Sequence, residues 1–468
     1  MDKKIKMPKS SALDKHFKIS ERGSSIKTEI VAGITTFFAM AYIIVLGPNQ
    51  ITGLSGGPFW NAVYIATVFG AILGTLYYAF YANLPYAQAC GIGLNAFFFT
   101  SFVSGMKGVT GYRAGLVIVL ISGVVFLVLS LTGAREIIAK SMPECIKKSI
   151  PVGIGLFIAF IGFQNVGIIQ DNPGTLVQFV QINGAEWSEI ASAIVALIGF
   201  FIIVILSALN VKGAVLIGVV ATTVIYYVAT WQLPSFEGGS VVGSFKEFFD
   251  ISFVAAFKPE SWKNAFSQEY VGGIFGAILL IISFSIVNMF DTIGTLYGTA
   301  SEAGMLDENG DPIDMNKAMT CDSAATITGA ICGTSTCTTF VESASGVAAG
   351  GRTGFASVIT AACFALCLFL TPIASIIPAA ATAPALIYVG VLMFRNVTSI
   401  DMTELRDKAT AFLTIIMMPL TYSIANGIGI GAIGYVIISL CTGKFKKSDI
   451  PVTVVAILFV FKFIFGGI

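Results

Sequence analysis

Long apolar stretches separated by short polar segments run through the chain from Glu29 to its C-terminal end. Most of them approach the roughly 20 residues that an α-helix needs to cross a hydrocarbon core of about 30 Å. A spanning helix satisfies its own backbone, and the alternating segments of about ten residues that build a transmembrane barrel are not sustained here. The pattern predicts an all-α polytopic membrane protein. The expected spans lie, approximately, at residues 29–47, 62–83, 92–104, 113–132, 149–163, 190–209, 213–231, 273–297, 317–331, 338–349, 353–371, 383–395, 409–425 and 427–442.

A hydrophilic stretch, residues 232–272, divides these spans into two sets of about seven. We interpret residues 29–231 and 273–443 as two seven-span repeats joined by an extracellular linker. The C-terminal part, residues 444–468, holds a basic loop and then a further apolar run. This run contains Lys462, so it fits either another span or a helix at the membrane interface.

Two sequence matches relate the halves to each other. Residues 90–101 parallel residues 332–343, and each segment leads to Ser-Gly and then to Arg-x-Gly. Residues 163–166 (Phe-Gln-Asn-Val) parallel residues 394–397 (Phe-Arg-Asn-Val) in the same order. An odd number of spans in each repeat turns the second copy over in the membrane. This is the inverted-repeat plan of secondary transporters.

In both halves one apolar run is short and broken by small residues, at 91–93 and at 333–339. These segments predict two discontinuous helices at the membrane midplane. Non-helical backbone is tolerated at that depth only where protein or a water-filled cavity covers it, and paired breaks point to a substrate site. The alternative is that the glycines only allow close helix packing.

Composition agrees with membrane insertion, since 56% of the 468 residues are hydrophobic and 11% are charged. A net charge of +1 gives no indication of a nucleic-acid partner. Basic residues gather at 1–28, 135–148 and 444–447, whereas residues 162–189 have none. Basic loops mark the cytoplasmic side, so residues 1–28 are expected to be a cytoplasmic tail of a multi-pass protein of the inner cell membrane.

The cysteines predict packing rather than metal binding. The eight cysteines lie mostly in or beside apolar runs, without a CxxC pair. The one histidine, His16, lies in the basic tail. We therefore expect no metal and no cofactor, and any proton relay must use carboxylates.

Three carboxylates interrupt the apolar segments: Asp291, Asp322 and Glu342. An ionisable residue inside the membrane is costly and usually faces a substrate or ion pathway. Glu342 follows the second broken stretch and Asp291 lies within a long span, so both are expected to bind substrate and to carry the coupling proton. Asp322 lies near the start of its span, where it could simply cap the helix.

Two buried amides complete the expected site. Asn288 precedes Asp291 by three residues, so the two side chains share one helix face. Asn95 lies in the first broken segment, where its amide either braces the break or contacts ligand. Thr339 and Phe340 lie three and two positions before Glu342, and Phe340 could stack on a planar ligand.

Several motifs in the same order closely resemble the adenine/guanine/hypoxanthine permeases, a branch of the nucleobase:cation symporters that are similar to xanthine and uracil permeases. The likeness extends from about residue 29 to residue 443. The motifs that carry it are Tyr81-Ala-Asn-Leu-Pro85, Gly93-Leu-Asn95-Ala-Phe-Phe, Asn288-Met-Phe-Asp291-Thr-Ile-Gly-Thr, Thr338-Thr-Phe-Val-Glu342-Ser-Ala-Ser-Gly-Val and Met418-Pro-Leu-Thr-Tyr-Ser-Ile.

The resemblance implies about fourteen spans in two inverted repeats, with spans 1–4 and 8–11 forming a core and the others a gate. It further implies that Glu342 and Asp291 hydrogen-bond a purine base, that Asn95 approaches the base, and that proton symport drives import. Homodimerisation is expected from related transporters. This branch commonly has Asp where the chain has Asn288, so one titratable group is missing.

Other functions fit the residues less well. An anion transporter of the same fold would bind its anion with helix ends and a basic residue, and the two expected site acids oppose this. An intramembrane enzyme would need a metal cluster or a Cys/His or Ser/His pair, which the chain lacks. We therefore expect a secondary active transporter of purine nucleobases that works by alternating access, and not an enzyme.

Overall fold

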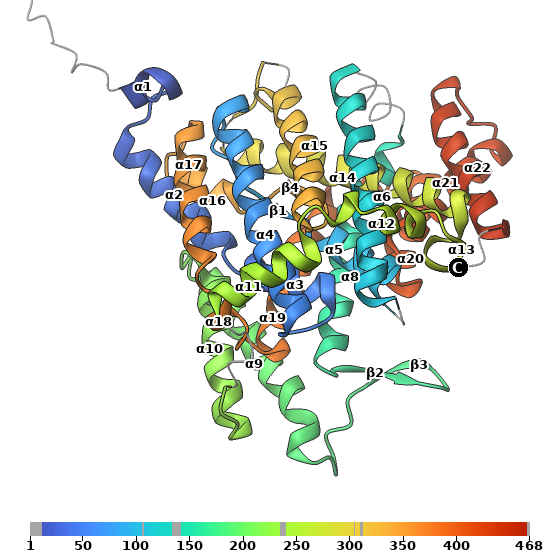
Figure 1. Cartoon of the computed structure of the whole chain (residues 1–468). Coiled ribbons are helices and arrows are strands. Elements are labelled where there is room, and N and C mark those ends of the chain that lie inside the picture. The colour runs from blue at the N-terminus through green and yellow to red at the C-terminus, as the bar shows by residue number, and fades with distance from the viewer. Residues whose placement is uncertain are drawn as a thin grey trace, which may run out of the picture.

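The computed structural model describes residues 12–104, 107–132, 142–234, 240–303, 305–308 and 312–465 (Figure 1). The basic residues among the first eleven positions, and residues 135–141 of the second basic segment, lie outside the described residues. The first half of the chain forms α1 (Ala12–Phe17), α2 (Ile26–Met40), α3 (Ile43–Thr52), α4 (Pro58–Tyr77) with η1 (Tyr78–Ala82), β1 (Gln88–Cys90), α5 (Ile92–Phe98) with η2 (Phe99–Val103), α6 (Gly108–Thr132), α8 (Glu144–Asn165), β2 (Ile169–Asn172), β3 (Leu176–Phe179), α9 (Trp187–Ala208) and α10 (Ala214–Thr230).

The second half repeats this plan after a helical connection. The connection consists of α11 (Val241–Glu247), η3 (Phe248–Ser252), η4 (Ala255–Phe257), α12 (Pro259–Ala265) and α13 (Gln268–Val271). The second half consists of α14 (Gly273–Ala303), α15 (Met315–Cys332), β4 (Cys337–Thr339), α16 (Ser343–Ala348), α17 (Gly354–Cys367), α18 (Thr371–Ala374), α19 (Ala379–Phe394) with η5 (Arg395–Ser399), α20 (Leu405–Leu420), α21 (Ile424–Cys441), η6 (Lys447–Asp449) and α22 (Ile450–Phe465).

Every predicted span falls on a helix or on a strand followed by a short helix, and the all-α class is confirmed. Among the described residues, eight helices are long and apolar enough to cross a membrane, and three shorter apolar helices accompany them. α15 and α20 are less apolar because they carry charged residues, such as Asp322 in α15 and Arg406 in α20.

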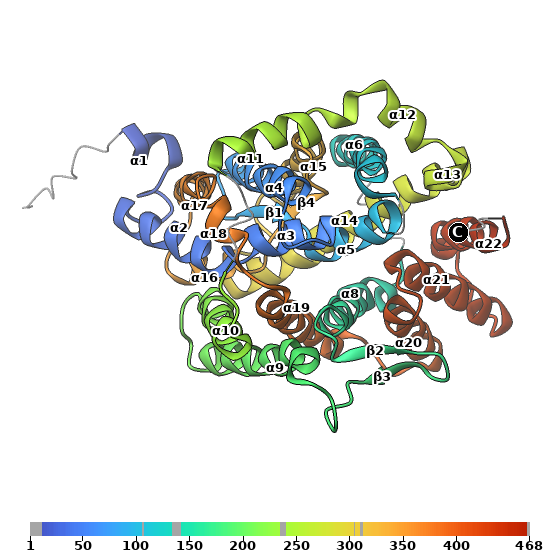
Figure 2. The same ribbon diagram turned by 60° about the horizontal axis from the view of Figure 1, so that its bottom comes forward.

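The helices form two groups that lie side by side in the end view (Figure 2). One group, which we call the core, contains α2–α6 and α14–α17. The other, the gate, contains α8–α10 and α19–α21. Each group takes helices from both halves of the chain, as the inverted-repeat prediction requires.

Two short strands pair in antiparallel orientation within the core. β1 pairs with β4, with Gln88 opposite Thr339 and Cys90 opposite Cys337. The N–H of Gly91 donates to the carbonyl of Thr336 at 2.9 Å, which extends the pairing. The strands lead into α5 and α16, so the two predicted broken helices satisfy each other's unwound backbone inside the protein.

The structure corrects the predicted alignment of the two repeats. Cys332, which the sequence match pairs with Cys90, is the last residue of α15, and the partner strand of β1 begins only at Cys337. Gly333 ends α15 with φ of +97°, and a Cβ at this glycine would lie 2.5 Å from the Cβ of Ser252. The match therefore joined a helix end to a strand, because small residues are common to both.

The hydrophilic connection is largely helical rather than an irregular loop. From α11 to α13 it passes along the outer surface of the core in the end view (Figure 2). Asn61 of α4 donates to Glu247 at 2.9 Å, and the N–H of Val254 donates to the carbonyl of Ile331 at 2.8 Å. A side-chain bond and a backbone bond thus hold the connection against the core, and its position on the extracellular side stays a prediction.

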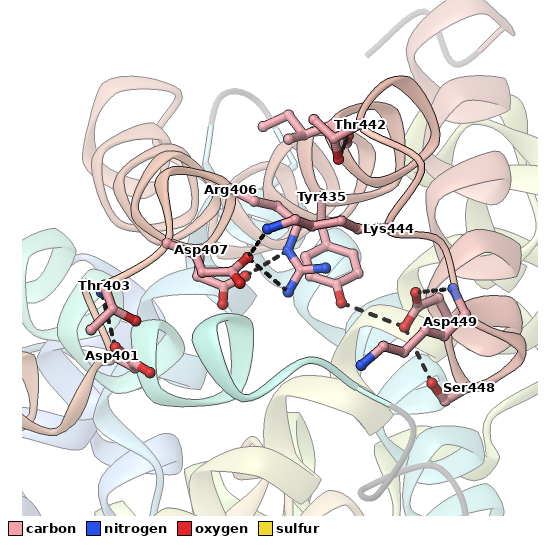
Figure 3. Close-up of polar contacts among 12 residues, drawn as sticks. Asp401, Thr403, Arg406, Asp407, Tyr435, Thr442, Lys444, Ser448 and Asp449 are labelled. Carbon is pink, nitrogen blue, oxygen red and sulfur yellow. Dashed lines mark hydrogen bonds and ion pairs between the residues drawn. The ribbon is translucent and has the colours of Figure 1, made fainter.

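Polar contacts fasten one end of the gate to the C-terminal helix (Figure 3). The Arg406 guanidinium of α20 lies 4.7 Å from the centroid of the Tyr435 ring of α21, and its Nε donates to Asp407 at 2.8 Å. The Tyr435 hydroxyl donates to Asp449 at 3.4 Å, directly before α22. The predicted apolar run at 450–465 is therefore a helix held against the gate.

Candidate functional site

A cavity of about 740 Å³ lies between core and gate. This volume is within the range of about 300–1,000 Å³ that is usual for small-molecule sites. The core contributes residues of the α2–α3 junction, α5, α14 and the β4–α16 segment, and the gate contributes residues of α8 and α19. The polar residues of the lining are Tyr42, Asn210, Asp291, Thr295, Thr338, Thr339, Glu342, Ser345, Tyr388, Arg395 and Asn396.

Glu342 occupies the N-cap position of α16 and lines this cavity. The Tyr42 hydroxyl donates to its Oε1 at 2.6 Å. Its second oxygen, Oε2, is buried and has no hydrogen-bond partner among the described residues. A buried carboxylate oxygen without a donor is unfavourable, so this atom is an open acceptor for a ligand.

Asp291 enters the cavity from α14. Val287 and Thr295, one turn before and one turn after it, line the same wall. Among the described residues none donates a hydrogen bond to the Asp291 carboxylate. The site therefore has two acidic groups with acceptor capacity that the protein does not fill.

Thr339 and Phe340 belong to the cavity wall as well, at the end of β4. The N–H of Phe340 donates to the carbonyl of Ala87 at 3.1 Å, and the Phe340 side chain is 7% exposed. The Thr339 hydroxyl hydrogen-bonds the Tyr78 hydroxyl at 2.6 Å and donates to Asp322 at 2.7 Å. These bonds fix the segment that leads to Glu342.

Asp322 is the hydrogen-bond centre of the core, and it does not cap α15, whose N-cap residue is Asp314. The carboxylate is fully buried. It accepts bonds from one side chain of each of the neighbouring elements η1, β1 and α14, and from two residues of β4. The donors are the Tyr78 hydroxyl at 3.0 Å, the Gln88 amide, the Thr292 hydroxyl at 2.6 Å, the Thr338 hydroxyl at 3.4 Å, and the N–H (3.1 Å) and hydroxyl (2.7 Å) of Thr339.

Asn95 and Asn288 are not among the residues that line the cavity. The Asn95 amide donates to the Cys90 thiol at 3.2 Å and accepts from the Ser335 hydroxyl, so it braces the first break against the second. Asn288 donates to Thr326 at 2.9 Å, and its oxygen is buried without a partner among the described residues.

The cavity also presents free backbone donors. The N–H groups of Ile92, Gly93 and Leu94, in the first turn of α5, have no backbone partner among the described residues. All three residues line the cavity. In the described part of the chain no three His, Cys, Asp or Glu side chains are grouped so that they could hold a metal. The arrangement suits a neutral ligand that has both donors and acceptors.

Comparison with known proteins decides the family. Residues 27–430 match the sequence family described as the permease family. The chain belongs to the permease family. A guanine/hypoxanthine permease of Bacillus subtilis, PbuO, is 40% identical to this permease over 95% of this chain and 98% of its own length. An adenine permease of Escherichia coli, AdeP, is 36% identical over 97% of this chain and 96% of its own.

A solved structure shares the fold. The transmembrane domain of a cyanobacterial bicarbonate transporter, BicA, superimposes on this permease with a TM-score of 0.61, covering 86% of this chain and 97% of that domain at 15% identity. The predicted transporter fold is thereby confirmed. Membership of the permease family also identifies the chain as a transporter rather than an enzyme.

The sequence predicted four of the cavity residues, Asp291, Thr339, Phe340 and Glu342, but missed Tyr42 and the role of Asp322. Tyr42 is 300 positions from Glu342. The only feature of the sequence that could have indicated Tyr42 is a tyrosine in the first span. Because the chain has 14 tyrosines, this feature alone does not single out one of them. The sequence suggested that Asp322 caps a helix. Its six donors come from segments that are distant in the sequence, and only the fold brings them together.

Asp322→Asn should disrupt the core, because the amide NH₂ would face hydroxyl and amide donors at a fully buried position. We expect a loss of stability of about 3 kcal/mol or more, measured as a lower unfolding temperature of the purified permease. The matched control is Asp401→Asn, an exposed carboxylate that accepts from the N–H of Thr403. Equal unfolding temperatures for the two variants would contradict the role given to Asp322.

Proposed function

We propose that this permease imports purine nucleobases across the cell membrane by alternating access, with protons as the coupling ion. The proposal draws first on the relatives, which carry the names of adenine and guanine/hypoxanthine permeases. It depends most on two carboxylates that line one cavity between core and gate: Glu342, whose Oε2 has no partner among the described residues, and Asp291, to which none of those residues donates.

The chemistry of the cavity supports a neutral heterocycle. A purine base carries ring and exocyclic N–H donors as well as nitrogen and oxygen acceptors. The donors would bind the oxygens of Glu342 and Asp291, and the acceptors would bind the backbone N–H groups in the first turn of α5. The Phe340 side chain offers an apolar face beside them. Asn95 and Asn288 would support the site from behind the cavity wall.

Anion transport, the activity in the name of the structural neighbour BicA, is the second candidate. Two carboxylates without a basic partner among the described residues would repel an anion by Coulombic interaction in a low-dielectric site. Arg395 lines the cavity, but at an exposed position of η5. The acidic interior therefore favours a neutral base together with a proton.

The direction that the cavity faces follows from counting spans. If the basic N-terminal tail is cytoplasmic, α9 and α19 both end on the cytoplasmic side. Asn210 and Asn396, which follow these helices, are exposed residues of the cavity lining. With that orientation, these two residues support our proposal that the cavity opens to the cytoplasm, in an inward-facing state in which the gate closes the outer side.

Cells without their own purine uptake should take up labelled hypoxanthine, guanine or adenine when they produce this permease. Unlabelled bases should compete, whereas their nucleosides should not, because the gate must close over the substrate and a ribose would prevent this. The measurement is initial uptake with each competitor at the same concentration. Competition by nucleosides, or uptake of bicarbonate in place of bases, would refute the substrate class.

Glu342→Gln should abolish accumulation driven by a proton gradient. Gln keeps the size and one acceptor but cannot ionise, so weak binding or exchange should survive, whereas Glu342→Ala should lose binding as well. The assay is uphill accumulation of labelled purine in proteoliposomes under an imposed pH gradient, with Asp291→Asn as the matched variant. If Glu342→Gln still concentrates purine as the parent does, Glu342 is not the coupling residue and Asp291 takes that place.

A further inference from the structure

Tyr42 occupies one of the two oxygens of the Glu342 carboxyl group. It lies at the break between α2 and α3 and is 3% exposed, so its ring is held by the core. Its hydroxyl donates to Oε1 of Glu342 at 2.6 Å. Only Oε2 is left without a partner. The carboxylate therefore presents one open acceptor instead of two.

The backbone of Glu342 is fixed independently of Tyr42. Its carbonyl accepts from the N–H of Ser345 at 3.0 Å and from the Ser345 hydroxyl at 2.6 Å. Removing the Tyr42 hydroxyl would thus leave Glu342 at the start of α16, with Oε1 newly free. A free carboxylate binds two adjacent N–H donors in a bidentate manner, as it does with the guanidinium group of arginine.

Purines differ in whether they offer such a pair. Guanine has adjacent N–H donors at ring position 1 and on its 2-amino group, whereas hypoxanthine has the ring donor and lacks the amino group. 2,6-Diaminopurine has the 2-amino group, but its ring position 1 is an acceptor that a carboxylate repels. A carboxylate with two open oxygens would favour guanine, and one with a single open oxygen gains nothing from the second donor.

We propose that Tyr42 is a specificity-determining residue, which occupies Oε1 of Glu342 and so removes the advantage that the 2-amino group of guanine would otherwise have. This inference rests on the purine substrate class proposed above. It makes Tyr42, a residue of the first span, responsible for discrimination between two bases that differ by one amino group.

The test is equilibrium binding of hypoxanthine and guanine to the purified permease and to Tyr42→Phe. The ratio of the two dissociation constants should shift toward guanine by about tenfold in the variant, the size expected for one added bond to a charged group. The ratio for adenine and 2,6-diaminopurine should stay unchanged, because that pair offers no second adjacent donor. The matched control is Tyr388→Phe, which removes a hydroxyl of the gate wall of the same cavity.

The outcomes separate the two proposals. If the parent protein binds none of these bases, the purine substrate class fails. If both bases bind but Tyr42→Phe weakens them equally, or if Tyr388→Phe shifts the ratio as much, Tyr42 has no role in specificity. The ratio of the two dissociation constants does not depend on the fraction of the protein that is folded. If Tyr42→Phe is not monodisperse, Tyr42→Met removes the hydroxyl in a second way.

Discussion

The structure depends on one carboxylate that holds two unwound chain segments together. Inside a membrane, non-helical backbone must find its hydrogen-bond partners within the protein. β1 and β4 do so by pairing with each other, and Asp322 accepts bonds from both of them and from α14 and η1. No ion pair of Asp322 is found among the described residues, so its two oxygens are satisfied by hydrogen bonds alone. This network fixes the place at which α16 begins, and with it the position of Glu342.

The core therefore contains two kinds of carboxylate, which differ in whether protein donors fill their oxygens. Asp322 is fully satisfied and is a structural residue. Glu342 and Asp291 retain free acceptor capacity in the cavity between core and gate. Because unpaired charge in a low-dielectric site is unstable, these two groups favour the entry of a ligand with N–H donors, of a proton, or of both. This physical requirement connects the proposed purine binding with the proposed proton coupling.

Much of this was predictable from the sequence. The length of the apolar stretches predicted the membrane spans, and the free-energy cost of burying a charge singled out Glu342 and Asp291. Sequence could not give the alignment of the two repeats, because small residues occur both at the end of α15 and in β4. Nor could it separate the bracing Asn95 from the open Glu342, since both are polar residues in broken segments. Contacts between distant segments, such as that of Tyr42 with Glu342, depend on the fold.

The most direct measurement of the central claim is an experimental structure of the permease with bound hypoxanthine. The account predicts the base between core and gate, with an N–H donor within hydrogen-bond distance of Oε2 of Glu342 and with Tyr42 still on Oε1. Asp322 should keep the same protein donors with and without the base. A base bound outside this cavity, or one that contacts Asp322 in place of Glu342, would contradict the account.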